Sequence, residues 1–233
     1  MSSQILTFRE LALREAITEL GVHERGFNNR GPEVDAYQRE GAAYVGWVGF
    51  AWCAAFVYRN FKHAGYPVEQ IPNRASVGYA ERYARLKDWL QKRPLRGDIV
   101  SYQFDGDTWP DHTGHVEKVL SLGPVLYLQT IEGNTSPGTG GSQSDGGGVY
   151  RRRRFVRANK VTFTRIPGRP KRNPAWLLFA LAGKEAWIEW YLGVGRWSGW
   201  GPRAKSVRPD VPSKIAKSWW LALAKRKQKE AKK

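Results

Sequence analysis

The residue of this chain best suited to covalent chemistry is its one cysteine, Cys53, in the apolar segment 51–57. A thiolate attacks carbonyl carbons, and thiols ionise more readily at the start of a helix and beside an imidazole. We expect a buried helix to begin at this segment and to present the sulfur in that way. A free cysteine among apolar residues is also typical of a small core residue. The polar residues that the fold brings to Cys53 therefore decide its role.

Four histidines are available as a base for the thiol. His23 lies in a polar loop, and His63 lies about ten residues beyond Cys53 on the same predicted helix, or ~15 Å along its axis. We expect neither to reach the sulfur. His112 and His115 begin a predicted strand that can pack against the helix, and residues three apart on a strand point to opposite faces. Only one of the two can face the helix, and the pattern leaves open which one.

Two further polar residues, Glu132 and Asn134, end another predicted strand in the segment 130–135. Side chains two residues apart on a strand share a face. One of them can orient an imidazole, and the other can lie nearer the thiol and help to hold a developing oxyanion. The alternative is a plain turn at the end of the strand, for which Glu-Gly-Asn is well suited.

The elements that must position these residues are helices first and strands afterwards, which predicts an α+β fold with an antiparallel sheet. A Thr7–Glu10 capping box begins the first helix, and Gly21 can end it. Apolar spacing and turn residues predict helices over 8–20, 33–38, 52–63 and 77–91, and strands over 99–104, 112–121, 125–132, 149–156 and 160–166. A Gly/Ser-rich loop spans 136–148.

The composition separates two regions of the 233-residue chain, whose formal net charge is +17. Residues 1–160 carry 21 basic and 17 acidic side chains, whereas residues 161–233 carry 17 and 4, together with seven of the 11 tryptophans. We expect a domain over 1–166, a Pro- and Arg-rich linker over 167–174, and a basic, Trp-rich helical region over 175–233. A single cysteine excludes an intramolecular disulfide framework. The N-terminus is not typical of a signal peptide, and no apolar run predicts a membrane span.

Four ordered segments carry a resemblance to a known family: Trp-Cys-Ala-Ala-Phe-Val at 52–57, Gly-Asp-Ile-Val at 97–100, Asp-His-Thr-Gly at 111–114 and Thr-Ile-Glu-Gly-Asn-Thr at 130–135. They resemble the motifs of the CHAP family of cysteine amidases and peptidases, over roughly residues 5–166. The resemblance implies a papain-like α+β domain, with N-terminal helices packed on an antiparallel sheet, that cuts an amide bond in bacterial peptidoglycan.

Carried over position by position, the resemblance implies that Cys53 is the nucleophile, His112 the base, Glu132 the group that orients the base and Asn134 a supporting polar residue. His115 stands where the family usually has an apolar residue. We expect it to be a packed histidine on the opposite face; a shifted strand register would instead make it the base.

No cofactor and no metal are expected. Some members of the family bind calcium through aspartates just before the cysteine, but segment 44–50 has no carboxylate. Asp105, Asp107 and Asp111 can form either a small oxygen-ligand cluster or, as we favour, a simple turn.

The functional expectation is a monomeric peptidoglycan hydrolase, either an N-acetylmuramoyl-L-alanine amidase or a crossbridge endopeptidase. Its expected setting is a bacteriophage endolysin or virion-associated lysin, made in the host cytoplasm without a signal peptide and acting at the cell wall. The alternative is a catalytically inactive wall-binding or phage tail structural protein. For residues 175–233 we expect binding to anionic wall polymers or a membrane surface. Packing on the catalytic domain is the second possibility, and nucleic acid is not an expected partner.

Overall fold

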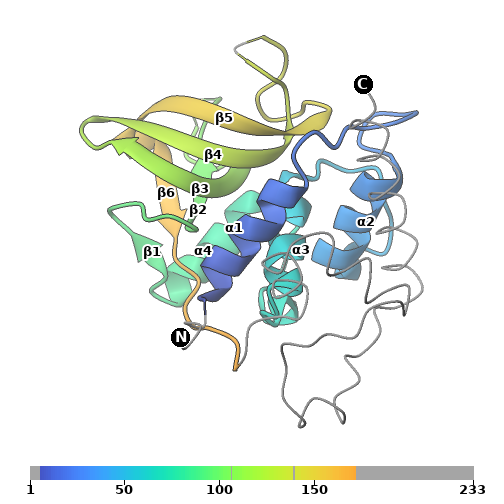
Figure 1. Ribbon diagram of the computed structural model, residues 1–233, viewed down its shortest axis with the longest axis horizontal. Helices are drawn as coiled ribbons and strands as arrows, with labels where there is room; N and C mark the ends of the chain where they lie inside the picture. Colours follow the sequence, from blue (N-terminus) through green and yellow to red (C-terminus); the bar gives the residue numbers. More distant parts are fainter. Residues whose placement is uncertain (1–5, 106, 139, 172–233) are drawn as a thin grey trace, which may run out of the picture. The chain divides into compact units, whose positions relative to one another are not determined.

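The computed structural model describes residues 6–105, 107–138 and 140–171 (Figure 1). Four α-helices precede all the strands: α1 (Phe8–Thr18), α2 (Pro32–Gly41), α3 (Cys53–His63) and α4 (Val77–Leu86). The strands are β1 (Leu90–Gln91), β2 (Ile99–Tyr102), β3 (His112–Ser121), β4 (Val125–Thr135), β5 (Gly148–Arg157) and β6 (Val161–Thr164). All pair antiparallel in one sheet of order β1-β6-β2-β3-β4-β5. The predicted α+β class with an antiparallel sheet is confirmed.

The first helix begins as the sequence predicts. The Thr7 hydroxyl accepts a hydrogen bond from the Glu10 amide at 3.2 Å, and the Glu10 carboxylate accepts one from the Thr7 amide at 2.9 Å. Each side chain thus satisfies a backbone group that a helix start leaves unpaired. Gly21 has φ +82, a left-handed conformation that glycine adopts without a steric cost. The helix itself ends a little earlier, at Thr18.

The helix predicted over 77–91 is wrong in its second part, because α4 ends at Leu86. Asp88 follows with φ +56, which turns the chain out of the helical path. Leu90 and Gln91 then pair with Thr164 and Phe163 of β6. The apolar spacing did not reveal this edge strand, because its pairing partner lies some seventy residues later in the chain.

The strand predicted over 99–104 ends at Tyr102, because the Phe104 amide donates to the Asp111 carboxylate at 3.0 Å in the turn that follows. The strand predicted over 125–132 continues to Thr135. The second helix is longer than predicted and runs over Pro32–Gly41.

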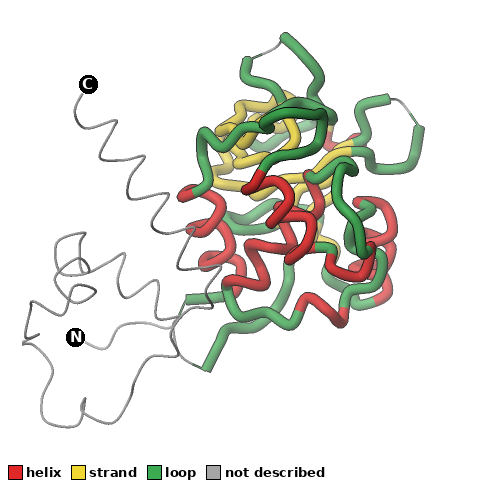
Figure 2. The backbone as a smooth tube through the Cα atoms, turned by 90° about the vertical axis from the view of Figure 1, so that its right-hand side faces the viewer, coloured by secondary structure: helices red, strands yellow, loops and turns green. Residues whose placement is uncertain are grey.

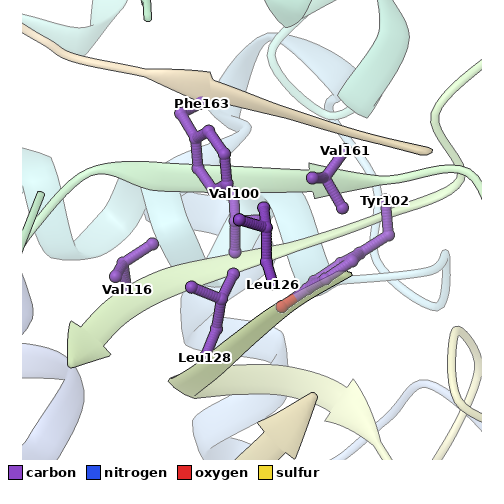
Figure 3. Packing of buried hydrophobic residues seen from close by; sticks show 7 residues of the cluster. All are labelled: Val100, Tyr102, Val116, Leu126, Leu128, Val161 and Phe163. Atoms are coloured by element: carbon purple, nitrogen blue, oxygen red, sulfur yellow. The ribbon is translucent and has the colours of Figure 1, made fainter. Parts of the chain in front are cut away.

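One face of the sheet carries an apolar core, shown in Figure 3. Its buried side chains come from four neighbouring strands, β6, β2, β3 and β4: Val100, Tyr102, Val116, Leu126, Leu128, Val161 and Phe163. The opposite face packs against α3 and α1, and α3 also packs against α2. Helices and strands therefore lie in separate layers in Figure 2. Gly133 marks the close approach between them, because a Cβ atom there would lie 2.7 Å from Trp52 and 2.8 Å from Phe56.

A buried polar network joins the first three helices. Arg59 of α3 donates to Glu15 at 3.1 Å and to Glu19 at 2.8 Å, both on or next to α1. His63 contacts Glu15 at 2.9 Å and Glu40 of α2 at 2.6 Å. His63 thus belongs to the helix packing and lies away from the start of α3, as expected.

The Gly97-Asp98 motif also links α1 and the end of β6 to the start of β2. The Asp98 carboxylate is fully buried and pairs with Arg9 at 2.6 Å and Arg165 at 2.8 Å, which ties α1 and the end of β6 to β2. Gly97 has φ +84, and a Cβ atom there would lie 2.9 Å from the Arg9 carbonyl oxygen. The motif therefore fixes the position of α1 relative to the sheet.

The part of the chain that the structure describes contains no helix long and apolar enough to cross a membrane. The helices predicted in residues 175–233, and the last residues of the predicted linker, lie outside the described residues. Residues 167–171 form neither helix nor strand, and the Gly168 carbonyl accepts a hydrogen bond from the Phe8 amide at 3.2 Å.

Candidate functional site

The structure places Cys53 at the first residue of α3, with 4 % of its surface exposed. Trp52, directly before it, is fully buried and donates from its indole nitrogen to Glu24 at 2.8 Å. Its ring also packs against Tyr37 of α2 and Phe56 of α3, with ring centroids 5.6 and 6.4 Å away. The large aromatic residue thus fixes where the helix begins and, with it, the position of the sulfur.

His112, the first residue of β3, is fully buried and interacts with Cys53. Its Nε2 lies 3.1 Å from Oε2 of Glu132. Its ring stacks on Tyr102 and Phe104, at centroid distances of 6.0 and 5.9 Å. Nδ1 makes no hydrogen bond of regular geometry with the described residues, so it is the ring nitrogen left for the thiol.

Burial disfavours the charged form of His112, but the Cys53 thiol and the Glu132 carboxylate outweigh burial and raise the pKa of the imidazole to about 9. The ring therefore holds its proton at neutral pH. An imidazolium beside a sulfur favours the thiolate, the nucleophilic form of cysteine. The pair is electrostatically arranged for proton exchange.

Glu132 of β4 is fully buried and accepts hydrogen bonds at both carboxylate oxygens. Besides His112, the donors are Thr130 at 2.6 Å, Tyr102 at 3.1 Å and the guanidinium of Arg154. Burial alone would raise the carboxyl pKa, but the hydrogen bonds from His112 and Arg154 hold it well below its usual range. Glu132 is therefore an anion that fixes the imidazole ring.

Gly114 explains how the carboxylate reaches the ring. A Cβ atom at this position would lie 2.6 Å from Cγ of Glu132, so a larger residue would displace the carboxylate. The glycine two residues after His112 is thus required by the site, in addition to its place in the 111–114 motif.

His115 lies on the opposite face of β3, as strand alternation requires. It is fully buried among Phe56, Asn60 and Phe61 of α3, and its Nε2 lies 3.3 Å from Nδ2 of Asn60. Burial lowers the pKa of its imidazole to about 3. His115 therefore packs against the side of α3 and does not meet the thiol. Cys53 lies at the very start of α3, where His112 on the other face of β3 reaches it.

Asn134 is not brought into the hydrogen-bond network of His112. It has φ +57, and its amide nitrogen lies 3.4 Å from both the Ser144 carbonyl and the Asp145 carboxylate. Its backbone carbonyl accepts from the Gly146 amide at 3.0 Å. These contacts stabilise the Gly/Ser-rich loop after β4. Although Asn134 lies two residues after Glu132, only Glu132 contacts the His112 imidazole.

The residue of this network that the sequence did not reveal is Arg154. The run of four arginines at 151–154 carries a signal, because β5 alternates and its second and fourth members point inward: Arg152 and Arg154 are buried, while Arg151 and Arg153 are exposed. Burying a guanidinium without a partner is costly, and an anion compensates its charge. For Arg154 that anion is Glu132.

The three aspartates before His112 act as turn residues. Asp111 accepts from the amides of Phe104 and Asp105 at 3.0 and 3.3 Å, and Asp107 accepts from the Trp109 amide at 2.6 Å. The described residues contain no cluster of three or more His, Cys, Asp or Glu side chains that could hold a metal ion.

A pocket of about 560 Å³ opens beside the start of α3. Phe50 and Ala51, which directly precede Trp52 and Cys53, line it, and three further aromatic residues surround it: Tyr44, Trp47 and Tyr79. These three are 49, 60 and 49 % exposed, so large aromatic surfaces face solvent there. Solvent-exposed aromatic rings around a concave site are typical of ligand binding.

Comparison with known proteins finds one family match. Residues 44–134 match the model of the CHAP domain, and the match spans Cys53, His112, Glu132 and Asn134. It supports a peptidase or amidase of the CHAP family; such domains are generally hydrolases, and their presence suggests activity on peptidoglycan. No curated protein and no solved structure matches the chain.

Proposed function

We propose that this chain hydrolyses an amide bond of bacterial peptidoglycan through a thiol acyl-enzyme mechanism. The observation that carries the proposal is the buried series Cys53, His112, Glu132, in which each group contacts the next. A thiol, a base and an anion that orients the base are the parts that nucleophilic acyl transfer needs. A core cysteine would not require a charged series behind it.

In the proposed reaction, Nδ1 of His112 takes the thiol proton and the Cys53 sulfur attacks the carbonyl carbon. The amide C–N bond then breaks as His112 gives the proton to the leaving nitrogen, which leaves a thioester on Cys53. Water, deprotonated by His112, attacks the thioester, and the acid leaves as the thiol is restored. Glu132 keeps the ring oriented and stabilises the imidazolium throughout.

The start of α3 supplies donors for the negative oxygen of the tetrahedral intermediate. The first intrahelical hydrogen bond runs from the Phe56 amide to the Trp52 carbonyl at 2.8 Å. The amides before it, including that of Cys53, have no acceptor within the helix and carry its partial positive charge. We assign the Cys53 amide as an oxyanion donor, because it belongs to the residue that attacks.

The aromatic pocket supports a polymeric substrate that extends away from the sulfur. Tyr44, Trp47 and Tyr79 offer flat apolar faces with polar edges, a surface on which sugar rings or peptide groups stack. The bond cut is either the N-acetylmuramoyl-L-alanine amide or a peptide of the crossbridge, and mass spectrometry of the released fragments distinguishes these two outcomes.

The test is hydrolysis of purified cell walls by the full chain and by Cys53→Ala. We expect the wild type to lower the turbidity of the walls and to release new amino groups, and Cys53→Ala to bind the walls without doing either. Equal failure of both proteins to release amino groups, with binding retained, would establish the alternative of an inactive wall-binding or tail structural protein.

The biological setting that we propose is cell-wall lysis by a bacteriophage endolysin or virion-associated lysin. The chain carries a net charge of +17, concentrated in residues 161–233 with most of the tryptophans. Such a region suits anionic wall polymers or an anionic membrane surface. A chain shortened after Lys171 should lose salt-sensitive wall binding and still cut soluble fragments; unchanged binding at every ionic strength would contradict this role.

A further inference from the structure

Arg154 of β5 lies beyond the segment that matches the CHAP domain, and its side chain is 8 % exposed. Its guanidinium donates hydrogen bonds to both oxygens of the Glu132 carboxylate. Nε donates to Oε1 at 3.0 Å, and Nη2 donates to Oε2. This two-point contact fixes the plane of the carboxylate as well as its position, which a single donor cannot do.

The guanidinium is itself held on its remaining sides. Nη1 donates to the Gln143 side chain at 2.6 Å, and Nη2 also lies 3.3 Å from the Thr135 hydroxyl. The cation lies over the rings of Tyr102 and Phe104, 5.5 and 5.2 Å from their centroids. The same two rings stack on His112. Arg154, Glu132 and the imidazole are thus parts of one packed unit.

The charge balance shows why a second cation is needed. Glu132 is fully buried, and a buried carboxylate without a cation takes up a proton. In the proposed reaction His112 is alternately an imidazolium and a neutral imidazole. Whenever the ring is neutral, Arg154 is the cation that remains in contact with Glu132, and a guanidinium does not lose its proton in proteins.

We propose that Arg154 is a positioning residue of the reaction, which keeps Glu132 ionised and correctly oriented while His112 exchanges its proton with Cys53 and the leaving group. This role rests on the proposed function. It acts through Glu132, because the contacts of the guanidinium are to that carboxylate and to the groups packed around it.

The first test compares Arg154→Gln, Arg154→Lys and the matched control Arg151→Gln. Arg151 lies on the same strand, but its side chain is 45 % exposed and pairs with Glu117 on the other face. With soluble wall fragments as substrate, we expect Arg154→Gln to lower kcat about 100-fold, within the usual range for disturbing a general base, with KM within about 2-fold. Arg154→Lys should recover about 10-fold in kcat, and Arg151→Gln should match the wild type. A wild-type kcat in Arg154→Gln would overturn the proposal.

The second test does not depend on the substrate. Because Cys53 is the one cysteine of the chain, the rate of its alkylation by iodoacetamide reports its thiolate over a range of pH. Without Arg154, Glu132 takes up a proton at higher pH and no longer stabilises the imidazolium. The acid limb of the alkylation profile should therefore move up by about one pH unit or more. If the acid limb of the Arg154→Gln profile does not move, the positioning role of Arg154 is overturned. If the limb moves but the wild type cuts no wall, the role of Arg154 stands and peptidoglycan hydrolysis is refuted.

A double variant distinguishes the proposed role of Arg154 from a loss of folding. Arg154→Gln leaves a buried carboxylate beside a neutral side chain, which can cost enough stability to unfold the domain. The double variant Glu132→Gln/Arg154→Gln removes both charges together. If Arg154 acts through Glu132, the double variant should alkylate and hydrolyse within about 2-fold of Glu132→Gln alone. A further loss of about 10-fold, at an unchanged melting temperature, would show an independent role and overturn the proposal.

Discussion

His112 and His115 lie three residues apart on β3, yet their surroundings shift their pKa values in opposite directions, to about 9 for His112 and to about 3 for His115. Both rings are fully buried. The difference lies in their partners: His112 has a thiol and a carboxylate, while His115 has two phenylalanine rings and an amide. One ring is charged at neutral pH and the other is neutral.

Replacing the two histidines should separate activity from stability. His112→Ala removes the base and should lower kcat by about 10²- to 10⁴-fold, with a smaller change in KM. His115→Ala removes core volume beside Phe56 and Phe61 and should lower the free energy of unfolding by about 2–4 kcal/mol, with kcat retained well below the melting temperature. Urea unfolding and hydrolysis of soluble wall fragments measure the two effects. Full activity of His112→Ala, with loss of activity in a folded His115→Ala, would reverse the assignment.

The decrease of kcat/KM at alkaline pH should reflect the deprotonation of His112. Because the ring must be protonated to give its proton to the leaving nitrogen, kcat/KM should fall as pH rises through about 9. Glu132→Gln removes a group that raises the pKa of His112 while burial still lowers it, so the limb should move to lower pH. Glu117→Gln, which changes a carboxylate paired with Arg151 on the other face, is the matched control. A limb that stays in place in Glu132→Gln contradicts the assignment.

His115 should make the domain less stable in acid. Burial lowers its folded pKa from the ordinary 6.5 to about 3, so its stabilising contribution is complete above pH 6.5 and is lost as pH falls toward 3. In that window the unfolded chain binds a proton that the folded chain does not. The resulting slope is about 1.4 kcal/mol per pH unit. His115→Gln should flatten the dependence of the free energy of unfolding on pH relative to the wild type; identical slopes in urea titrations from pH 7 to 5 would show that the ring is protonated in the folded chain.

The aromatic pocket should contribute substrate binding. Trp47 is 60 % exposed beside Phe50, with the two ring centroids 5.2 Å apart. Trp47→Ala should raise KM for wall fragments about 2- to 10-fold, as expected for the loss of one aromatic contact, with kcat nearly unchanged. Phe27→Ala, at an exposed phenylalanine that does not line the pocket, controls for a general loss of surface aromatic residues. Equal effects of the two changes on KM would exclude a specific role for the pocket.

Local sequence patterns were sufficient where short-range rules operate. The capping box at Thr7, the helix that starts at Cys53 and the strand that starts at His112 all follow from capping chemistry and from periodicity over a few residues. Alternation along β3 also required that His112 and His115 lie on opposite faces. The edge strand β1 was missed because its partner, β6, is distant in the chain and pairing across such a separation leaves no local signal.

The cysteine, the two candidate histidines and the polar pair Glu132 and Asn134 could be identified as candidates from the sequence alone, because few residue types can act as a nucleophile, a base or a group that orients the base. The tertiary structure decided which histidine meets the sulfur, since this depends on Cys53 lying at the very start of α3 and not along its flank. It also turned Asn134 toward the 144–146 loop and brought Arg154 to Glu132. Such pairings depend on strand register and on the need of a buried charge for a partner, and both are set by the whole sheet.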